Sequence, residues 1–136
     1  MPKKCDHMLS PKWTPTDNLG IAYDVESMAW GDTISFTLVA DKKRVAHDNI
    51  HRFRLEWDSS YIIAYNVTDE TYRADCWGLD FENNGRFYTS TDSDYIEVFK
   101  NKSLLFSDDT VHFLIVGTNA IVEVLAKEYP AVRIMN

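Results

Sequence analysis

Long apolar runs are missing from the 136-residue sequence. The longest run with a single interruption is Val111 to Val116, which His112 breaks, whereas a membrane helix needs about 20 apolar residues. The first residues, Met-Pro-Lys-Lys-Cys-Asp-His, lack the apolar segment of a secretory signal. Two cysteines, Cys5 and Cys76, are too few for a disulfide framework. We therefore expect a cytoplasmic protein with free thiols and no membrane contact.

Glycine is also scarce, and the usual motifs of nucleotide binding and catalysis are missing. With five glycines the chain has no Gly-rich phosphate loop, and neither a Gly-x-Ser-x-Gly nor a Cys-x-x-Cys pattern occurs. We therefore expect no enzymatic activity and no cofactor.

Two patterns resemble metal sites without completing one. His47 and His51 would share one face of a helix, but no third ligand stands near them in register. Asp92-Ser93-Asp94 has the carboxylate pair that holds divalent cations, but lacks the glycine and the distant glutamate of a calcium loop. We expect both to be solvated and to bind no metal. We expect His112 to be a core histidine bonded to backbone rather than a catalytic base.

Basic residues are few and scattered. The chain has 14 Lys and Arg against 21 Asp and Glu, whereas nucleic-acid binding depends largely on basic side chains that neutralise phosphates. The densest basic groups are Lys42-Lys43-Arg44 and the pair Arg52 and Arg54, and neither has an aromatic stacking platform beside it. The composition argues against nucleic acid as a direct partner.

Turn residues recur every eight to twelve positions after residue 18, which is the spacing of a β-sandwich or barrel. Alternation of apolar and polar residues predicts strands at 33–40 and 52–57, and a polar turn leads into another at 61–67. The turn Asn83-Asn84-Gly85 is expected to join strands at 72–81 and 86–90. A second hairpin is expected over 95–106. The apolar run 111–116 predicts a central strand, and one more follows at 120–127.

Helical patterns are rare. Asp41 could cap a short helix over 41–50, and residues 24–30 suit either helix or strand. We therefore predict one mainly β domain over residues 19–136, an antiparallel sandwich or partly closed barrel with one or two short helices. An extended arm is expected over residues 1–18. An α+β roll is the alternative fold.

The negative charge is concentrated in one stretch of the chain. Residues 69–109 hold ten carboxylates and four basic residues, a local net charge of −6 (4 minus 10) against −7 for the whole chain. Eight aromatic residues lie among them. If residues 73–81 formed a strand, alternate residues would share one face that mixes charge with large apolar surface, as interfaces do. They are Arg73, Asp75, Trp77, Leu79 and Phe81.

A concentrated acidic field can steer a basic partner. We therefore expect a small acidic protein-binding module that neutralises a basic partner protein. In size and charge it is comparable to inhibitors such as the bacterial immunity proteins that block toxins or nucleases. Six residues are the expected contacts: Asp75, Trp77, Asp80, Glu82, Tyr95 and Glu97.

Two other functions are compatible with the sequence. An aromatic-rich β-barrel could enclose a small ligand, with a lining of Trp30, Trp57, Tyr61 and Tyr65. The chain could also be a structural subunit that self-associates through an apolar face or a sheet edge. The sequence leaves the oligomeric state open.

Overall fold

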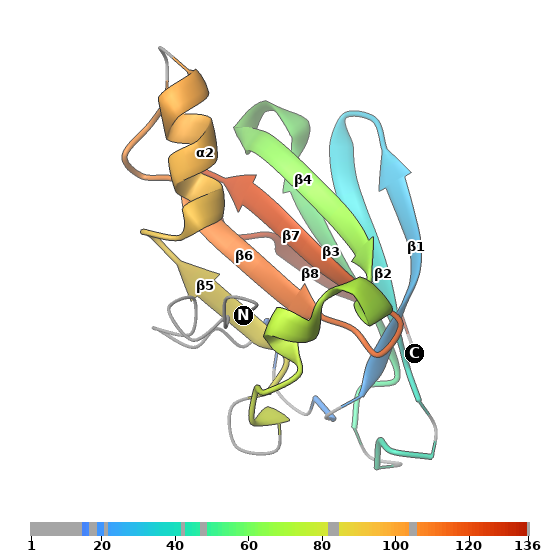
Figure 1. Ribbon diagram of the computed structural model, residues 1–136. Coiled ribbons are helices and arrows are strands. Elements are labelled where there is room, and N and C mark those ends of the chain that lie inside the picture. The colour runs from blue at the N-terminus through green and yellow to red at the C-terminus, as the bar shows by residue number, and fades with distance from the viewer. Residues whose placement is uncertain are drawn as a thin grey trace.

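Two four-stranded antiparallel sheets face each other in the computed structural model, which describes residues 15–16, 19–20, 22–41, 43–46, 49–81, 85–103 and 106–135 (Figure 1). Sheet 1 has the strand order β1 (Tyr23–Trp30), β2 (Thr33–Ala40), β3 (Arg52–Asp58) and β8 (Ala131–Ile134). Sheet 2 has the order β4 (Ile62–Asp69), β7 (Ala120–Ala126), β6 (Val111–Val116) and β5 (Phe87–Ser90). Most of the arm predicted for residues 1–18 lies outside the described residues.

The prediction of a mainly β, antiparallel sandwich is confirmed. Within the described residues the two sheets do not join at their edges, so the fold is a sandwich and not a closed barrel. One α-helix, α2 (Asp94–Lys102), is described in full. No helix in the described part of the chain is long and apolar enough to cross a membrane.

The core lies between the sheets and is rich in aromatic side chains. In β3, Phe53, Leu55 and Trp57 are buried and alternate with more exposed residues, as the period of two predicts. The Trp57 ring packs edge-on against Phe113 of β6, with 5.4 Å between the ring centroids. Strand β6 lies between β5 and β7 and is buried on both faces, which confirms the predicted central strand.

The strand predicted at 72–81 is wrong. This segment forms two 3₁₀ turns, η3 (Glu70–Tyr72) and η4 (Ala74–Cys76), in which Arg73 and Cys76 donate backbone hydrogen bonds three residues back. The Asp69 side chain starts the first turn by accepting from the Thr71 amide at 2.9 Å. Cys76 and Leu79 are the buried residues, so burial follows a spacing of three and not of two. Alternate residues from 73 to 81 therefore do not share a face.

The hairpin predicted over 95–106 is also wrong, because residues 94–102 form helix α2. Ser93 caps the helix, and its Oγ accepts from the Ile96 amide at 3.3 Å. Acidic side chains occupy the first turn and lysines the last, which suits the helix dipole. Tyr95 and Phe99 pack together one turn apart, with 5.4 Å between their ring centroids.

Three smaller differences between the predicted and the observed structure concern a short helix, a C-terminal strand and a turn. Residues 43–46 of the predicted helix over 41–50 lie in turns, while His47 and Asp48 are outside the described residues. Strand β8 follows Pro130 and was not predicted. Asn83 and Asn84 lie outside the description; Gly85 has a positive φ of 72°, but β5 pairs with β6 and not with the segment before it.

β1 is an edge strand of sheet 1 and β4 is an edge strand of sheet 2 (Figure 1). Met28 and Trp30 of β1 pair with the core residues Phe36 and Ile34 and therefore lie on the inner face of sheet 1. Tyr65 of β4 lies on the inner face of sheet 2 for the same reason. These inner-facing side chains are nevertheless exposed, and Trp30 reaches 77%. Trp30, Tyr61 and Tyr65 are thus exposed, while Trp57 is buried in the core, so the four do not line a common interior cavity.

Asn119, in the turn between β6 and β7, ties sheet 2 to β1. Its side-chain amide accepts from the Val25 N–H at 2.8 Å and donates to the Val25 carbonyl at 2.9 Å. The ladder between β1 and β2 has a bulge between Val25 and Ser27. The amide side chain therefore occupies the place that a neighbouring strand would take beside Val25.

We predict that Asn119→Ala removes both hydrogen bonds and lowers the free energy of unfolding by about 1–2 kcal/mol. Amide hydrogen exchange should accelerate at Val25 in particular, as measured by NMR. Asn101→Ala, at an exposed position near the end of α2, is the matched control and should change neither quantity. Equal exchange rates at Val25 in both variants would contradict this role of Asn119.

Candidate functional site

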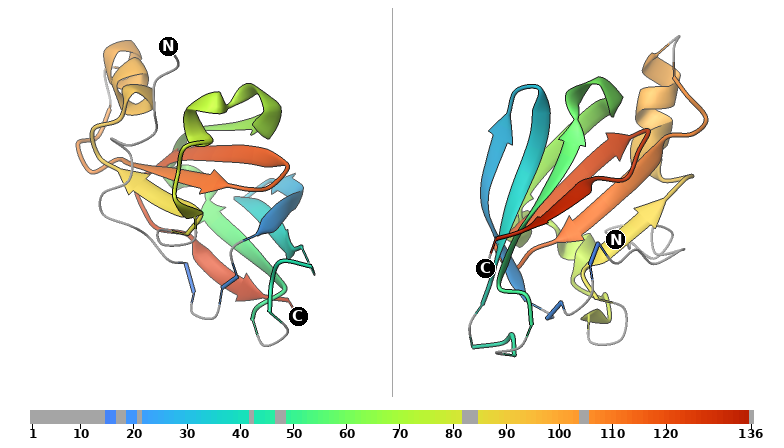
Figure 2. Two further views of the ribbon diagram at one scale, coloured as in Figure 1. Left: turned by 60° about the horizontal axis from the view of Figure 1, so that its bottom comes forward. Right: turned by 180° about the vertical axis from the view of Figure 1, so that it is seen from behind.

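Two segments cover the outer face of sheet 2, and together they form what we call the covering layer. It consists of residues 70–81, which contain η3 and η4, and helix α2 (Figure 2). A second apolar cluster attaches residues 70–81 to the outer face of β5, β6 and β7, and it is separate from the core between the sheets. Its buried members are Cys76, Leu79, Tyr88, Leu114, Val116 and Ile121. Cys76 is a free thiol, as predicted.

A continuous row of polar side chains, which we call the polar chain, runs beneath this layer. The Oγ atom of Ser93 lies 2.6 Å from Nδ1 of His112. Nε2 of His112 lies 2.8 Å from a carboxylate oxygen of Glu123 on β7. Glu123 also pairs with the Arg73 guanidinium, whose Nε atom donates to Asp75 at 3.0 Å. The polar chain therefore links both parts of the covering layer to the middle of sheet 2.

Burial sets the electrostatics of the polar chain. Burial alone would raise the pKa of Glu123, but contacts with His112 and Arg73 outweigh it and hold the pKa below its ordinary value. Burial would likewise lower the pKa of Arg73, but Asp75 and Glu123 raise it well above its ordinary value. Burial, and then the charge of Glu123, raise the pKa of Tyr95 to about 12. At neutral pH Glu123 and Arg73 are therefore both charged and Tyr95 is neutral.

Ser93, His112 and Glu123 are the residue types of a nucleophilic triad, and here they connect the start of helix α2 to β6 and β7. The Ser93 hydroxyl is fully buried and already accepts the Ile96 amide at the helix start. A nucleophile has to be reached by its substrate. The prediction that His112 bonds to backbone is wrong, because its partners are the Ser93 and Glu123 side chains.

The structure places the six sequence-predicted contacts in different settings. Trp77 is 61% exposed, and its indole N–H donates to the Glu70 carbonyl at 3.3 Å. Asp80 and Glu97 are exposed, and Glu82 lies outside the described residues. Asp75 and Tyr95 are half-buried and lie toward opposite ends of the polar chain. Asp75 pairs with Arg73, whereas the Tyr95 ring packs edge-on against His112.

Sequence reasoning missed four residues that organise this layer. Tyr72 is 81% exposed and lies five residues before Trp77, and Ser93, Arg73 and Glu123 hold the layer in place. A signal for Glu123 was present, because a single carboxylate in the apolar run from 120 to 126 requires a buried partner. Nothing local in the sequence identified that partner as Arg73, which lies 50 residues away.

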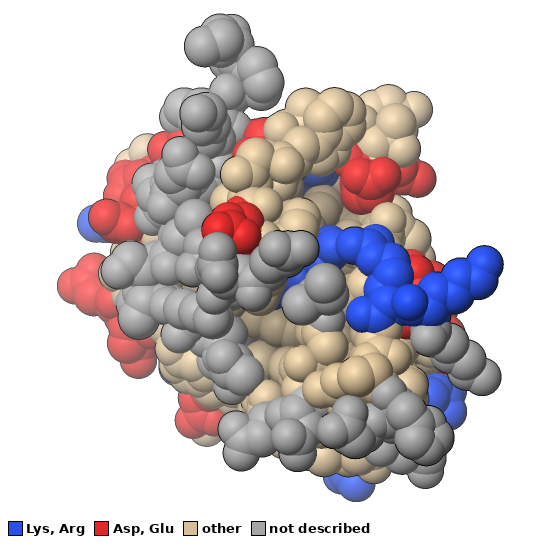
Figure 3. All heavy atoms as spheres, turned by 90° about the horizontal axis from the view of Figure 1, so that it is seen from below, with Lys and Arg blue, Asp and Glu red and all other residues tan. Residues whose placement is uncertain are grey.

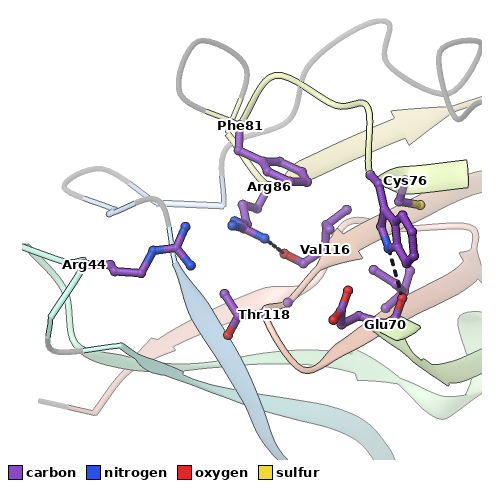
Figure 4. A pocket seen from close by; sticks show the side chains of 10 residues that line it. Arg44, Glu70, Cys76, Phe81, Arg86, Val116 and Thr118 are labelled. Atoms are coloured by element: carbon purple, nitrogen blue, oxygen red, sulfur yellow. Dashed lines mark hydrogen bonds between the residues drawn. The ribbon is translucent and has the colours of Figure 1, made fainter. Parts of the chain in front are cut away.

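A pocket of about 270 Å³ opens beside residues 70–81 (Figure 4). Its apolar part includes Cys76, Val116 and Ile121, and Trp77 and Phe81 add aromatic surface. Arg44, Arg86, Glu70 and Thr118 supply the polar part. Figure 3, seen from below Figure 1, shows basic side chains beside a hollow on this face. We call this hollow the basic pocket.

The buried guanidinium of Arg86 is held in place in the basic pocket. It stacks on the Phe81 ring, 4.0 Å from the ring centroid, and donates to the Val116 carbonyl at 3.3 Å. Burial and the nearby charge of Arg44 both lower the pKa of Arg86. Among the described residues, no group of three or more His, Cys, Asp or Glu side chains could hold a metal ion.

No protein-family model, curated protein or solved structure matches the chain. Its function therefore has to be inferred from the geometry of the covering layer and the basic pocket.

We predict that Glu123→Gln lowers the free energy of unfolding by about 3 kcal/mol at pH 7, because the buried Arg73 and His112 side chains lose the carboxylate that they contact, although Arg73 keeps Asp75 as a partner. The pKa of Glu123 is lowered in the folded state, so its contribution to stability is complete above the ordinary value of 4.5 and is lost as pH falls through the folded value. The difference between wild type and variant should therefore shrink below pH 4.5, as measured by urea unfolding at a series of pH values.

Glu97→Gln, on the exposed face of α2, is the control and should change the free energy of unfolding by less than about 0.5 kcal/mol. A deficit of Glu123→Gln that stayed constant across the acid range would show that the ionised carboxylate is not what stabilises the fold.

Proposed function

We propose that this chain is a protein-binding module that inhibits a basic partner protein through its covering layer. Tyr72 and Trp77 are the aromatic anchors of the contact. Asp69, Asp80 and Glu97 provide the surrounding negative charge. In this proposal the protein has no catalytic role and blocks its partner by occupying a basic surface.

The exposure of Tyr72 and Trp77 is the observation that carries the proposal. Both rings are mostly open to water, although they lie five residues apart in a segment that buries Cys76 and Leu79. Tyrosine and tryptophan are the residues most enriched among binding hot spots, because they bury large areas and still offer a polar atom. Two such rings on one short segment mark it as a contact surface.

Charge supports the same surface. Asp69 and Asp80 lie in or next to the segment that carries the two rings, and both are exposed. Hydrogen bonds from the Thr71 side chain and amide lower the pKa of Asp69, so this carboxylate stays ionised at neutral pH. Exposed charges around apolar anchors accelerate the encounter with an oppositely charged partner.

The polar chain supports the proposal by holding the surface rigid. Asp75 and Tyr95, expected from the sequence to touch the partner, instead pair with Arg73 and pack against His112. Their role in this proposal is to position the layer from which Trp77 projects. A surface that is ordered before binding loses less conformational entropy when the partner arrives.

We predict that Tyr72→Ala and Trp77→Ala each weaken binding of the partner by tenfold or more, about the effect expected of a hot-spot residue. The partner would first be captured on tagged wild-type protein in the native host at low salt and identified, and its affinity would then be measured with purified components. Trp30→Ala is the matched control, since Trp30 is 77% exposed but lies at the β1 edge, outside the covering layer.

Charge reversal tests the electrostatic part separately. Asp80→Lys combined with Glu97→Lys should lower the association rate and reduce its dependence on salt. Asp32→Lys combined with Glu128→Lys makes the same change of net charge at exposed positions outside the layer. If the ring variants bind the identified partner as tightly as Trp30→Ala does, or if the two charge pairs behave alike, the covering layer is not the contact surface.

A further inference from the structure

We propose that the basic pocket binds a small organic anion, namely an aromatic ring that carries one carboxylate or phosphate group. This site is distinct from the protein contact surface, although Trp77 borders both. The proposal depends on the convergence of two arginines on one hollow that also has an apolar, aromatic lining.

The charges in the pocket favour an anion. Two guanidinium groups, those of Arg44 and Arg86, line it together with one carboxylate, Glu70. The two guanidinium groups point toward one another across part of the hollow (Figure 4). Like charges close together repel, and an oxyanion placed between them removes this repulsion. Two arginines beside one hollow are notable in a chain whose net charge is −7.

Arg86 is arranged as a preorganised anion receptor. Its side chain is 8% exposed, and the Phe81 ring and the Val116 carbonyl fix its orientation. A guanidinium offers five N–H donors in a planar fork that matches the oxygens of carboxylate and phosphate. Arg44, which is exposed, can close onto the same anion from the other side.

The rest of the pocket selects the body of the ligand. Val116, Ile121 and Cys76 provide apolar surface, and Trp77 at the rim offers a ring face for stacking. A volume of about 270 Å³ is slightly below the range of pockets that hold drug-sized molecules, which starts at about 300 Å³. One aromatic ring with one charged group suits this size, whereas an inorganic ion alone would leave the apolar surface unused.

The test is a titration of isotope-labelled protein by NMR, with benzoate and phenyl phosphate as probes. The backbone amides of residues 116–118 and the indole N–H of Trp77 are the reporters. Benzamide, which has nearly the shape of benzoate without its charge, is the neutral control. Inorganic phosphate is the control for the charge without the ring. Comparison of the two probes distinguishes a carboxylate ligand from a phosphate ligand.

Arg44→Gln is the informative variant, because Arg44 is exposed and its substitution leaves the core intact. Lys43→Gln removes the same charge from the neighbouring exposed residue, which does not line the pocket. We expect saturable shifts at the reporters with at least one probe, and binding about tenfold weaker for Arg44→Gln, since charged hydrogen bonds are the strong ones. Lys43→Gln should bind as wild type does, and Tyr72→Ala, which alters only the protein contact surface, should as well.

Four results would overturn the proposal. One is the absence of saturable shifts at residues 116–118 with either probe. Another is equal binding of benzamide and benzoate, which would remove the role of charge. The third is equal weakening by Arg44→Gln and Lys43→Gln, which would reduce the effect to net charge. Equal affinity for inorganic phosphate and phenyl phosphate would likewise contradict the role of the aromatic lining.

Discussion

The arrangement of the outer half of this protein depends on one buried carboxylate. Glu123 stands in the middle of β7, on the outer face of sheet 2, opposite Leu114 of β6. An ionised group in such a place is tolerated only when opposite charge and hydrogen bonds surround it. Arg73 supplies the charge and lies within residues 70–81, and His112 contacts both Glu123 and Ser93, which caps the start of α2. The position of residues 70–81 and the start of α2 both follow from this requirement.

This arrangement explains how a segment without regular structure can present a defined surface. Residues 70–81 consist of short 3₁₀ turns, which have little stability of their own. Cys76 and Leu79 fix the segment by apolar contact, and Arg73 fixes it by charge. Tyr72, next to Arg73, and Trp77, next to Cys76, are exposed beside these attachments. A segment of irregular structure takes a defined position from the scaffold beneath it, and here the polar chain is part of that scaffold.

Much of the fold could be predicted from the sequence, because in β2, β3, β6 and β7 the local pattern and the tertiary environment agree. The predictions of secondary structure were wrong in segments whose conformation depends on contacts with residues distant in the sequence. Alternation at 72–81 suggested a strand, but the burial of Cys76 and Leu79 against sheet 2 favours turns. The aromatic residues at 95–99 suggested a strand too. The N-cap residue Ser93, the acidic residues in the first turn and the lysines in the last turn instead favour a helix. The acidic stretch is a property of the sequence itself, and the role of Trp77 as a contact stays a prediction. The pairing of Glu123 with Arg73, and the approach of Arg44 to Arg86, could not be predicted, because no local pattern encodes contacts between such distant residues.

The bulges at the two exposed sheet edges have a consequence for the behaviour of this protein at high concentration. β1 is irregular between Val25 and Ser27, and β4 between Ile62 and Ala64. An incoming strand could pair with either edge only over short stretches before the register is lost. Trp30 and Tyr65 are therefore exposed on edge strands that offer only short regular stretches for strand addition. Mutual repulsion between molecules of net charge −7 acts in the same direction.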